Sequence, residues 1–349
     1  MLYVAYPLLR VSTESAGGAE QVLLTVESEM AAAGHQTTVA ACNSSRVKGR
    51  LLATGPAATS LDQFERRDGE HSAKILSYLR QHPDEFDLIH DNSGAFFRHA
   101  AECPVPLLAT LHLPRSFYRD EYFQELPPNV FFNCVSRSQE SSFSNLSNVL
   151  GVVENGVAIE EFSFTPEKAD YVLWLGRISE EKAPHLAVAA AQKAGLPLII
   201  AGQVYPFRYH QQYFEREIQP RLARGSALRF IDSPRKRQKL DLLRRARALL
   251  VTSTAEETSS LVAMEAMACG TPVIAFRRGA LPEIVADGET GFVVDSVDGM
   301  AAALRNLGQI SATACRARVE RRFTAKRMAL EYEALYCIVL ARAAERAAA

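Results

Sequence analysis

Short apolar runs alternate with longer stretches of helical periodicity along this whole sequence. A run of about five residues suits a strand that is buried on both faces, and each intervening stretch can hold a crossover helix. This alternation is typical of a parallel sheet covered by helices. The runs expected to form strands are residues 2–6, 37–41, 86–90, 107–112 and 130–136 in the first half, and 171–176, 196–202, 228–232, 247–253, 271–276 and 291–295 in the second.

The domain organisation follows from the length and from one interruption of this rhythm. A chain of 349 residues is long for a single hydrophobic core. Residues 155–168 combine an Asn-Gly pair, a proline and several charges, which is typical of a linker. We therefore expect the α/β fold class with two doubly wound, Rossmann-like domains over residues 1–160 and 161–325, followed by a C-terminal helix over residues 326–349.

The charges of the sequence are nearly balanced, with 39 Lys and Arg against 40 Asp and Glu. This balance predicts no general attraction to nucleic acid, so nucleic acid is not an expected partner. The six cysteines are scattered without a CxxC pair, and no metal site is expected. The N-terminus lacks a basic leader and no stretch reaches the roughly 18 apolar residues of a transmembrane segment, so a cytoplasmic protein is expected.

The loop after the first strand of the second domain carries two cations. In residues 176–186, GRISEEKAPHL, Arg177 and Lys182 precede Pro184, which suits the first position of a helix. Free amides at a helix N-terminus and two cations together favour an anion, and a diphosphate is a natural ligand. The alternative is that both cations are solvated loop residues.

Two carboxylates accompany the next helix of interest, in residues 256–275, EETSSLVAMEAMACGTPVIA. Glu257 precedes this helix, and Glu265 lies about one turn inside it among apolar and small residues. A buried carboxylate without donors costs on the order of several kcal/mol, and ribose or hexose hydroxyls are suitable donors. Alternatively, both carboxylates are structural and bind neighbouring backbone or an arginine such as Arg277 or Arg278.

The start of the same helix provides further groups for a ligand. Ser259 or Ser260 is expected to cap a helix that begins near Leu261. The amides of these three residues would then point outward at the carboxyl end of a strand, where doubly wound sheets bind ligands. Anion-binding amides, two cations and two hydroxyl acceptors on adjacent loops together suggest a nucleotide sugar.

These motifs resemble the second domain of the retaining, GT-B-fold glycosyltransferases called glycosyltransferase family 4. The resemblance lies in GRISEEK, in EETSSLVAMEAMACGTPVIA and in RGALPEIVADGETGFVVD, in this order. Looser similarities are the early GGAEQ, the linker VVENGVAIEEF and the closing helix FTAKRMALEYEALY. The resemblance implies two Rossmann-like domains facing across a cleft, the first on the acceptor side and the second on the donor side, with the C-terminal helix returning toward the first.

The resemblance also assigns roles to residues of the second domain. Arg177 and Lys182 would bind the donor diphosphate, Glu257 the hydroxyls of the transferred sugar, and Glu265 the ribose. The amides of residues 259–261 would meet sugar and phosphate. Catalytic roles are thereby implied for Arg177, Lys182 and Glu257.

Three residues of the first domain are assigned in the same way. Gly17 and Gly18 would let the first loop approach the diphosphate, because glycine permits close backbone contact. His112, at the end of an expected strand, matches a family histidine near the reacting sugar and is implied to be catalytic. A single histidine at a strand end is otherwise more often structural.

The implied reaction transfers a hexose from a nucleoside diphosphate sugar to an acceptor hydroxyl, with retention of configuration and without a metal. No further cofactor is expected, and the acceptor, whether glycan, lipid-linked compound or small molecule, is not identified. The alternatives are an epimerase or phosphorylase on the same fold, or a non-catalytic nucleotide-sugar binding protein. The basic residues 234–247 could contact an anionic membrane, but a solvated helix face above Leu240, Leu242 and Leu243 is favoured.

Overall fold

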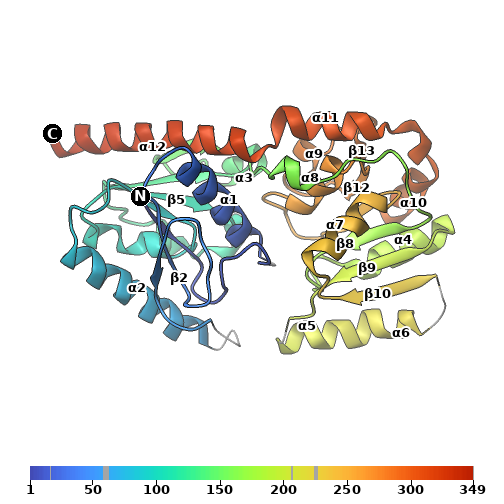
Figure 1. Ribbon diagram of the computed structural model, residues 1–349. Coiled ribbons are helices and arrows are strands. Elements are labelled where there is room, and N and C mark those ends of the chain that lie inside the picture. Colours follow the sequence, from blue (N-terminus) through green and yellow to red (C-terminus); the bar gives the residue numbers. More distant parts are fainter. Residues whose placement is uncertain (16, 58–62, 206, 224–226, 349) are drawn as a thin grey trace. The chain divides into compact units, whose positions relative to one another are not determined.

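The protein is described by a computed structural model that covers residues 1–15, 17–57, 63–205, 207–223 and 227–348. The chain divides into two compact units (Figure 1). The first consists of Met1–Asn155 together with Ala325–Ala349, and the second of Gly156–Thr324. Each unit is an α/β domain built on a parallel sheet, as the alternation of apolar runs and helical stretches predicts.

The described residues of the first unit form a seven-stranded parallel sheet with the order β3-β2-β1-β4-β5-β6-β7. Its strands are β1 (Leu2–Val4), β2 (Thr38–Ala41), β3 (Arg50–Ala53), β4 (Ile89–Asp91), β5 (Leu107–Leu111), β6 (Val130–Cys134) and β7 (Val149–Val152). The α-helices among its described residues are α1 (Gly18–Ala32), α2 (Phe64–Gln81), α3 (Arg137–Ser142) and α12 (Ala325–Ala348), and the 3-10 helices are η2 (Phe96–Glu102), η3 (Arg115–Phe117) and η4 (Asp120–Phe123). The strand order reverses between β1 and β4.

The C-terminal helix α12 belongs to the first unit, where it packs against α1 (Figure 1). Two of its tyrosine hydroxyls enter a buried polar network above the sheet. The Tyr336 hydroxyl lies 2.7 Å from Nδ1 of His90, and the Tyr332 hydroxyl lies 3.2 Å from that of Thr110. Thr110 Oγ1 also lies 2.7 Å from Nε2 of His90 and donates to Asn133 Oδ1 at 2.8 Å. These hydrogen bonds therefore link α12 to strands β4, β5 and β6.

The described residues of the second unit form a six-stranded parallel sheet with the order β10-β9-β8-β11-β12-β13. Its strands are β8 (Val172–Leu175), β9 (Leu198–Gly202), β10 (Leu228–Asp232), β11 (Leu249–Val251), β12 (Val273–Phe276) and β13 (Gly291–Val294). The helices are α4 (Pro184–Ala194), α5 (Arg208–Tyr213), α6 (Gln219–Leu222), α7 (Lys236–Arg245), α8 (Leu261–Ala268), α9 (Leu281–Ile284), α10 (Val297–Arg305) and α11 (Ala312–Arg322), with the shorter η5 (Ile159–Glu161), η6 (Phe214–Ile218) and η7 (Leu307–Gln309). Here the strand order reverses between β8 and β11.

The stretch expected to be a linker packs onto the second unit. Val157 forms a bridge with Thr324 and its side chain is buried. Phe162 is buried in the same hydrophobic cluster as Leu249 and Met267. Because both apolar side chains are covered, residues 157–162 are a fixed part of this domain.

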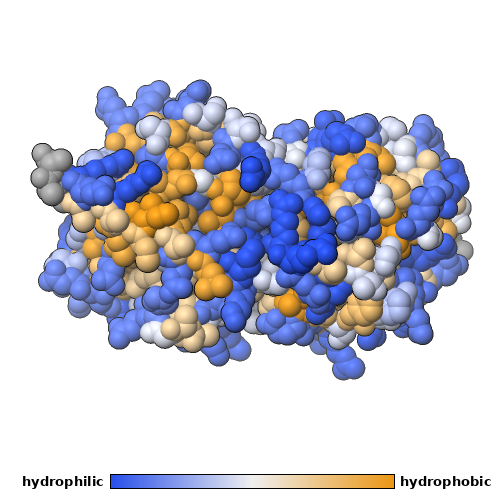
Figure 2. Space-filling model, turned by 90° about the horizontal axis from the view of Figure 1, so that it is seen from above, coloured by the Kyte–Doolittle hydropathy of each residue, from blue (hydrophilic) through white to orange (hydrophobic). Residues whose placement is uncertain are grey.

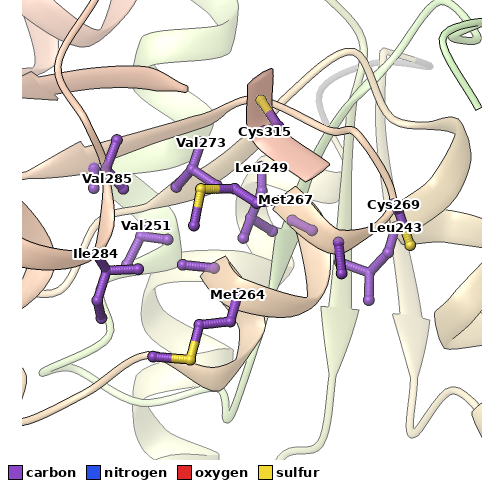
Figure 3. Packing of buried hydrophobic residues seen from close by; sticks show 14 of the residues in the cluster. Leu243, Leu249, Val251, Met264, Met267, Cys269, Val273, Ile284, Val285 and Cys315 are labelled. Atoms are coloured by element: carbon purple, nitrogen blue, oxygen red, sulfur yellow. The ribbon is translucent and has the colours of Figure 1, made fainter. Parts of the chain in front are cut away.

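Helix α8 is embedded in the core of the second unit. Met264 and Met267 lie in one cluster with Leu249 and Val251 of β11 and Val273 of β12 (Figure 3). Its three alanines, Ala263, Ala266 and Ala268, are buried as well, and such small side chains allow the helix to lie close to the sheet. The buried position of α8 is what makes a carboxylate within it noteworthy.

Apolar and polar side chains alternate on the face seen in Figure 2. Helix α12 contributes three large exposed apolar residues, which are Leu330, Ile338 and Leu340.

Among the residues that the structure describes, no helix combines the length and the apolar character needed to cross a membrane.

Candidate functional site

The loops after β8 and β11 lie side by side where the strand order of the second sheet reverses. Thr254 N donates to Glu181 O at 2.8 Å. Thr252 Oγ1 lies 3.0 Å from Lys182 O and 2.9 Å from Ala183 O, and it accepts from Trp174 Nε1 at 3.0 Å. Open α/β sheets bind ligands in the crevice at this kind of reversal, outside the carboxyl ends of the strands.

Lys182 and Glu257 form an ion pair that joins these two loops. Lys182 Nζ lies 2.5 Å from Glu257 Oε1, and Ser253 Oγ donates to the same oxygen. Lys182 is partly exposed and Glu257 largely buried. The two side chains that were expected to bind diphosphate and sugar are therefore direct neighbours, and each neutralises the other.

Glu257 is also fixed through its backbone. Its carbonyl oxygen accepts from Ala280 N at 2.7 Å. Gly279 lies directly against it with a φ of +51°, and a β-carbon at this position would lie 2.1 Å from Glu257 O. A larger residue at position 279 would therefore displace the loop that carries Glu257.

Arg177 is held at the other end of the β8 loop. Its Nη2 lies 2.7 Å from Glu181 Oε1, and its guanidinium lies over the ring of Tyr205 with a centroid distance of 5.8 Å. Burial raises the pKa of Glu181, but its backbone hydrogen bond and the charge of Arg177 outweigh that effect, so the pKa lies below its usual value. Arg177 remains partly exposed and is free to meet an anion from the solvent side.

His210, on α5 after β9, lies near this arginine. The imidazole is fully buried, and neither ring nitrogen has a hydrogen-bond partner. Burial, reinforced by the charge of Arg177, lowers its pKa to about 4. The ring is therefore neutral at pH 7 and adds no positive charge beside Arg177.

Glu265 projects from the first turns of α8, and its side chain is only 6% exposed. Its Oε1 lies 2.6 Å from Lys239 Nζ. Its Oε2 is buried and has no hydrogen-bond partner. An unpartnered carboxylate oxygen in a buried position is costly unless a ligand or water donates to it.

The partners of the two carboxylates differ from those that the sequence suggested. Arg277 pairs with Asp295 at 3.1 Å, and the cation at Glu265 is Lys239 from α7. The expectation that the basic residues 234–247 form a solvated face holds for most of α7, since Leu242 and Leu243 are buried beneath it. It is wrong for Lys239, because this side chain reaches across to α8.

The N-terminus of α8 lacks the serine cap that the sequence predicted. The helix begins at Leu261 as predicted, and Ser260 occupies the N-cap position, but no serine side chain caps the helix. The Ser259 hydroxyl is buried without a partner. The first amides of an α-helix have no acceptor within the helix, so a ligand at this end would meet unpaired donors.

The residues predicted for the first domain lie in the first unit. Gly17 is the N-cap of α1, in the loop after β1, and Gly18 is the first helical residue. His112 follows β5, and its Nε2 lies 2.9 Å from Oδ1 of Asn92, which follows β4. Burial lowers the pKa of His112 to about 4, so its ring is neutral at pH 7. The roles of these three residues toward the donor stay predictions.

Sequence reasoning missed two charged residues, Lys239 and Glu20. Glu20 lies in the first turn of α1, where burial raises its pKa to about 7, and a β-carbon at Gly17 would lie 1.9 Å from its Oε2. Its position within GGAEQ was a usable signal. Lys239 had none, because it is one of several cations in an amphipathic stretch.

Two family models match consecutive parts of the chain. The model described as "Glycosyltransferase Family 4" matches residues 16–155, and that described as "Glycosyl transferases group 1" matches residues 158–314. Together they cover most of both units.

A curated relative is the D-inositol 3-phosphate glycosyltransferase of Corynebacterium glutamicum (strain R). It is 25% identical over 352 residues, which span 83% of this chain and 82% of that enzyme. Six further proteins of that name are 30–36% identical, but the chain spans only 31–36% of their length. The one from Corynebacterium urealyticum is 23% identical, with 84% of this chain and 82% of that enzyme covered.

Two solved structures show the same fold. Sucrose-phosphate synthase from Thermosynechococcus elongatus has a TM-score of 0.81 at 21% identity, with 97% of this chain and 98% of that chain covered. Anabaena HepE, solved in complex with UDP-glucose, has a TM-score of 0.72 at 17% identity, with 96% and 98% covered. Such low identities support the shared fold alone.

Proposed function

Because the chain belongs to the glycosyltransferase family of these models and has its GT-B fold, we propose that it transfers a hexose from a nucleoside diphosphate sugar to an acceptor hydroxyl. We propose further that the configuration at the anomeric carbon is retained. The counter-charge for the diphosphate would come from protein groups rather than from a metal. The acceptor is proposed only as a hydroxyl compound, which leaves glycans, lipid-linked compounds and small molecules open.

One observation carries the donor assignment. It is the unpartnered oxygen of Glu265, on the helix α8 that follows the β11 loop. Oε2 of Glu265 is buried without a hydrogen bond, although Oε1 of the same group is paired. A hydroxyl is the neutral donor that would satisfy it without adding charge, and ribose carries two adjacent hydroxyls. A nucleoside therefore suits the α8 end of the site.

The cations on the neighbouring loop suit the diphosphate. As the glycosidic bond breaks, negative charge grows on the leaving diphosphate, and groups already aimed at it stabilise the transition state. Arg177 and Lys182 are partly exposed on the loop after β8, next to the free amides at the start of α8. We assign these groups to the leaving phosphates.

The ion pair between Lys182 and Glu257 suggests how diphosphate and sugar are recognised together. Lys182 Nζ lies 2.5 Å from the Glu257 carboxylate. A diphosphate would compete for this ammonium, and the Glu257 carboxylate would then be available to accept from sugar hydroxyls. Glu257 is accordingly assigned to the sugar, and its loss is expected to affect sugar discrimination more than nucleotide binding.

The proposal is tested with a thermal-shift panel of UDP, GDP, ADP and TDP and their common sugars. A ligand that binds the native state raises its melting temperature, so the base and the sugar are identified in one experiment. Hydrolysis and transfer are then followed with the donor that binds. If no nucleotide raises the melting temperature, the donor assignment is wrong. Tight donor binding without hydrolysis, and without transfer to any acceptor of a panel, would favour the binding-protein alternative.

A further inference from the structure

Lys239, in the basic stretch of residues 234–247, contacts Glu265 of the proposed donor site. It lies on α7, and its Nζ is 2.6 Å from Glu265 Oε1. Its side chain is 25% exposed, whereas that of Glu265 is 6% exposed. The ammonium is therefore partly open to solvent, whereas the carboxylate that it contacts is buried.

We propose that Lys239 is a positioning and specificity residue of the donor site, which holds Glu265 so that Oε2 receives a ribose hydroxyl and thereby selects ribonucleoside diphosphate donors. This inference rests on the proposed function. It adds Lys239, from a different helix, to the ribose contact that the family resemblance assigns to Glu265.

The geometry of the pair supports this role. A carboxylate has two oxygens, and the ammonium occupies one of them while the other stays without a partner. The surrounding helix is tightly packed with small and apolar residues, which restricts rotation of the carboxylate. The pair thus presents one defined acceptor, Oε2, to a ligand.

Selectivity follows from the cost of leaving that acceptor unpaired. A ribose hydroxyl donates a charge-assisted hydrogen bond to Oε2. A nucleotide that lacks the hydroxyls covers the same buried oxygen and gives it no donor, which loses the bond and keeps the desolvation cost. Discrimination is expected to be large because the acceptor is both charged and buried.

Helix α7 also provides a matched control. Lys236, one turn before Lys239, pairs with Glu161 at 2.8 Å, and both of these side chains are well exposed. Lys236→Met removes the same charge from the same helix without touching Glu265. Any effect that Lys239→Met has and Lys236→Met lacks can be attributed to the contact with Glu265.

The experiment measures the affinity of the ribonucleoside diphosphate that binds and of its 2′,3′-dideoxy counterpart, by calorimetry. The wild-type protein is expected to prefer the ribo form by about ten- to a hundredfold, which is the range for a hydrogen bond to a charged group. Lys239→Met is expected to reduce this preference to about threefold or less. Lys236→Met should keep the wild-type preference for the ribo form, and Lys239→Arg should retain most of it.

The outcomes separate this inference from the proposed function. If Lys239→Met keeps the wild-type preference for the ribo form, Lys239 does not position Glu265. If the wild-type protein binds both forms equally, Glu265 does not read the ribose, although the diphosphate assignment stands. If no nucleoside diphosphate binds at all, the proposed function itself fails. Thermal unfolding of each variant shows whether it is folded, and Lys239→Arg keeps the test valid if Lys239→Met is unstable.

Discussion

Two buried polar regions of this molecule differ in whether their side chains have hydrogen-bond partners. Under α12, the side chains of His90, Thr110 and Asn133 are hydrogen-bonded to one another or to tyrosines of the helix. At the start of α8 and one turn inside it, Ser259 Oγ and Glu265 Oε2 are buried without partners. Folding alone accounts for the first region. In the second region, folding leaves polar atoms without partners, and this difference supports the proposal that it is a binding site.

Protonation supports the same distinction. Burial, and to a lesser degree the charge of His112, lowers the pKa of His90 to about 3, so its ring is neutral at pH 7. A neutral imidazole has one donor and one acceptor, and both nitrogens of His90 face hydroxyls at 2.7 Å. The network thus uses each hydrogen-bonding group of the ring, and no ligand is needed to complete it.

The largest effect is expected from Tyr332→Ala in the satisfied network. Loss of this buried ring leaves a cavity and removes a partner of Thr110, so the free energy of unfolding of the first unit should fall by about 3–5 kcal/mol. Urea denaturation measures this. The control Leu330→Ala, on the same helix but 57% exposed, should change it by less than about 0.5 kcal/mol. A small effect of Tyr332→Ala would show that the network does not hold α12 in place.

Glu265→Gln should have the opposite profile, with a large loss of binding and a small change in stability. The affinity for a nucleoside diphosphate is expected to fall by about ten- to a hundredfold, because a charged acceptor is replaced by a neutral amide. Calorimetry measures the affinity and thermal unfolding the stability. Glu161→Gln removes an exposed carboxylate from the same unit and should bind like the wild type. Normal binding by Glu265→Gln together with a large fall in melting temperature would make Glu265 structural.

Lys182→Ala should weaken binding of the sugar-free nucleoside diphosphate by about tenfold, since it removes one charge-assisted contact from a partly exposed site. The salt dependence of binding should decrease as well, because one cation fewer meets the phosphates. Lys193→Ala is the control, since this lysine forms an exposed pair with Asp298 in the same unit. Equal affinities of Lys182→Ala and the wild type would contradict the diphosphate assignment.

The smallest expected effect concerns the pH dependence of His112. Burial lowers its pKa to about 4, so its ring stays neutral from pH 8 down to pH 6 and gains a proton only near pH 4. The rate loss caused by His112→Gln should therefore be the same at pH 6 and at pH 8. Initial rates with the identified donor measure this ratio. A step near pH 6.5 that disappears in His112→Gln would show that the ring titrates at its ordinary pKa.

The sequence predicted the strands of the second sheet, including its edge strands β10 and β13, but missed the two edge strands of the first sheet. Strands covered on both faces form continuous apolar runs, which is why β5, β6 and β12 were found within two residues of their bounds. β3 and β7 were missed, because both are four-residue edge strands with partly exposed side chains. β7 also contains Gly151, whose φ of +133° is unusual for a strand.

For the candidate site, the sequence pattern was enough to predict which residues lie at the carboxyl ends of β8 and β11. The reason is that loop position depends on the local alternation of apolar and helical stretches, which places Arg177, Lys182, Glu257 and the start of α8. The roles of these residues in the reaction remain predictions from the family resemblance.

The pairing of these charges could not be predicted, because it depends on the folded structure. Lys182 lies 75 residues before Glu257, and Lys239 lies 26 residues before Glu265. No local period relates such positions, because their distance depends on how α7, α8 and the β8 loop pack on one sheet. The unpartnered Oε2 of Glu265 also follows from packing, since burial and hydrogen bonding are properties of the folded environment and not of the residue.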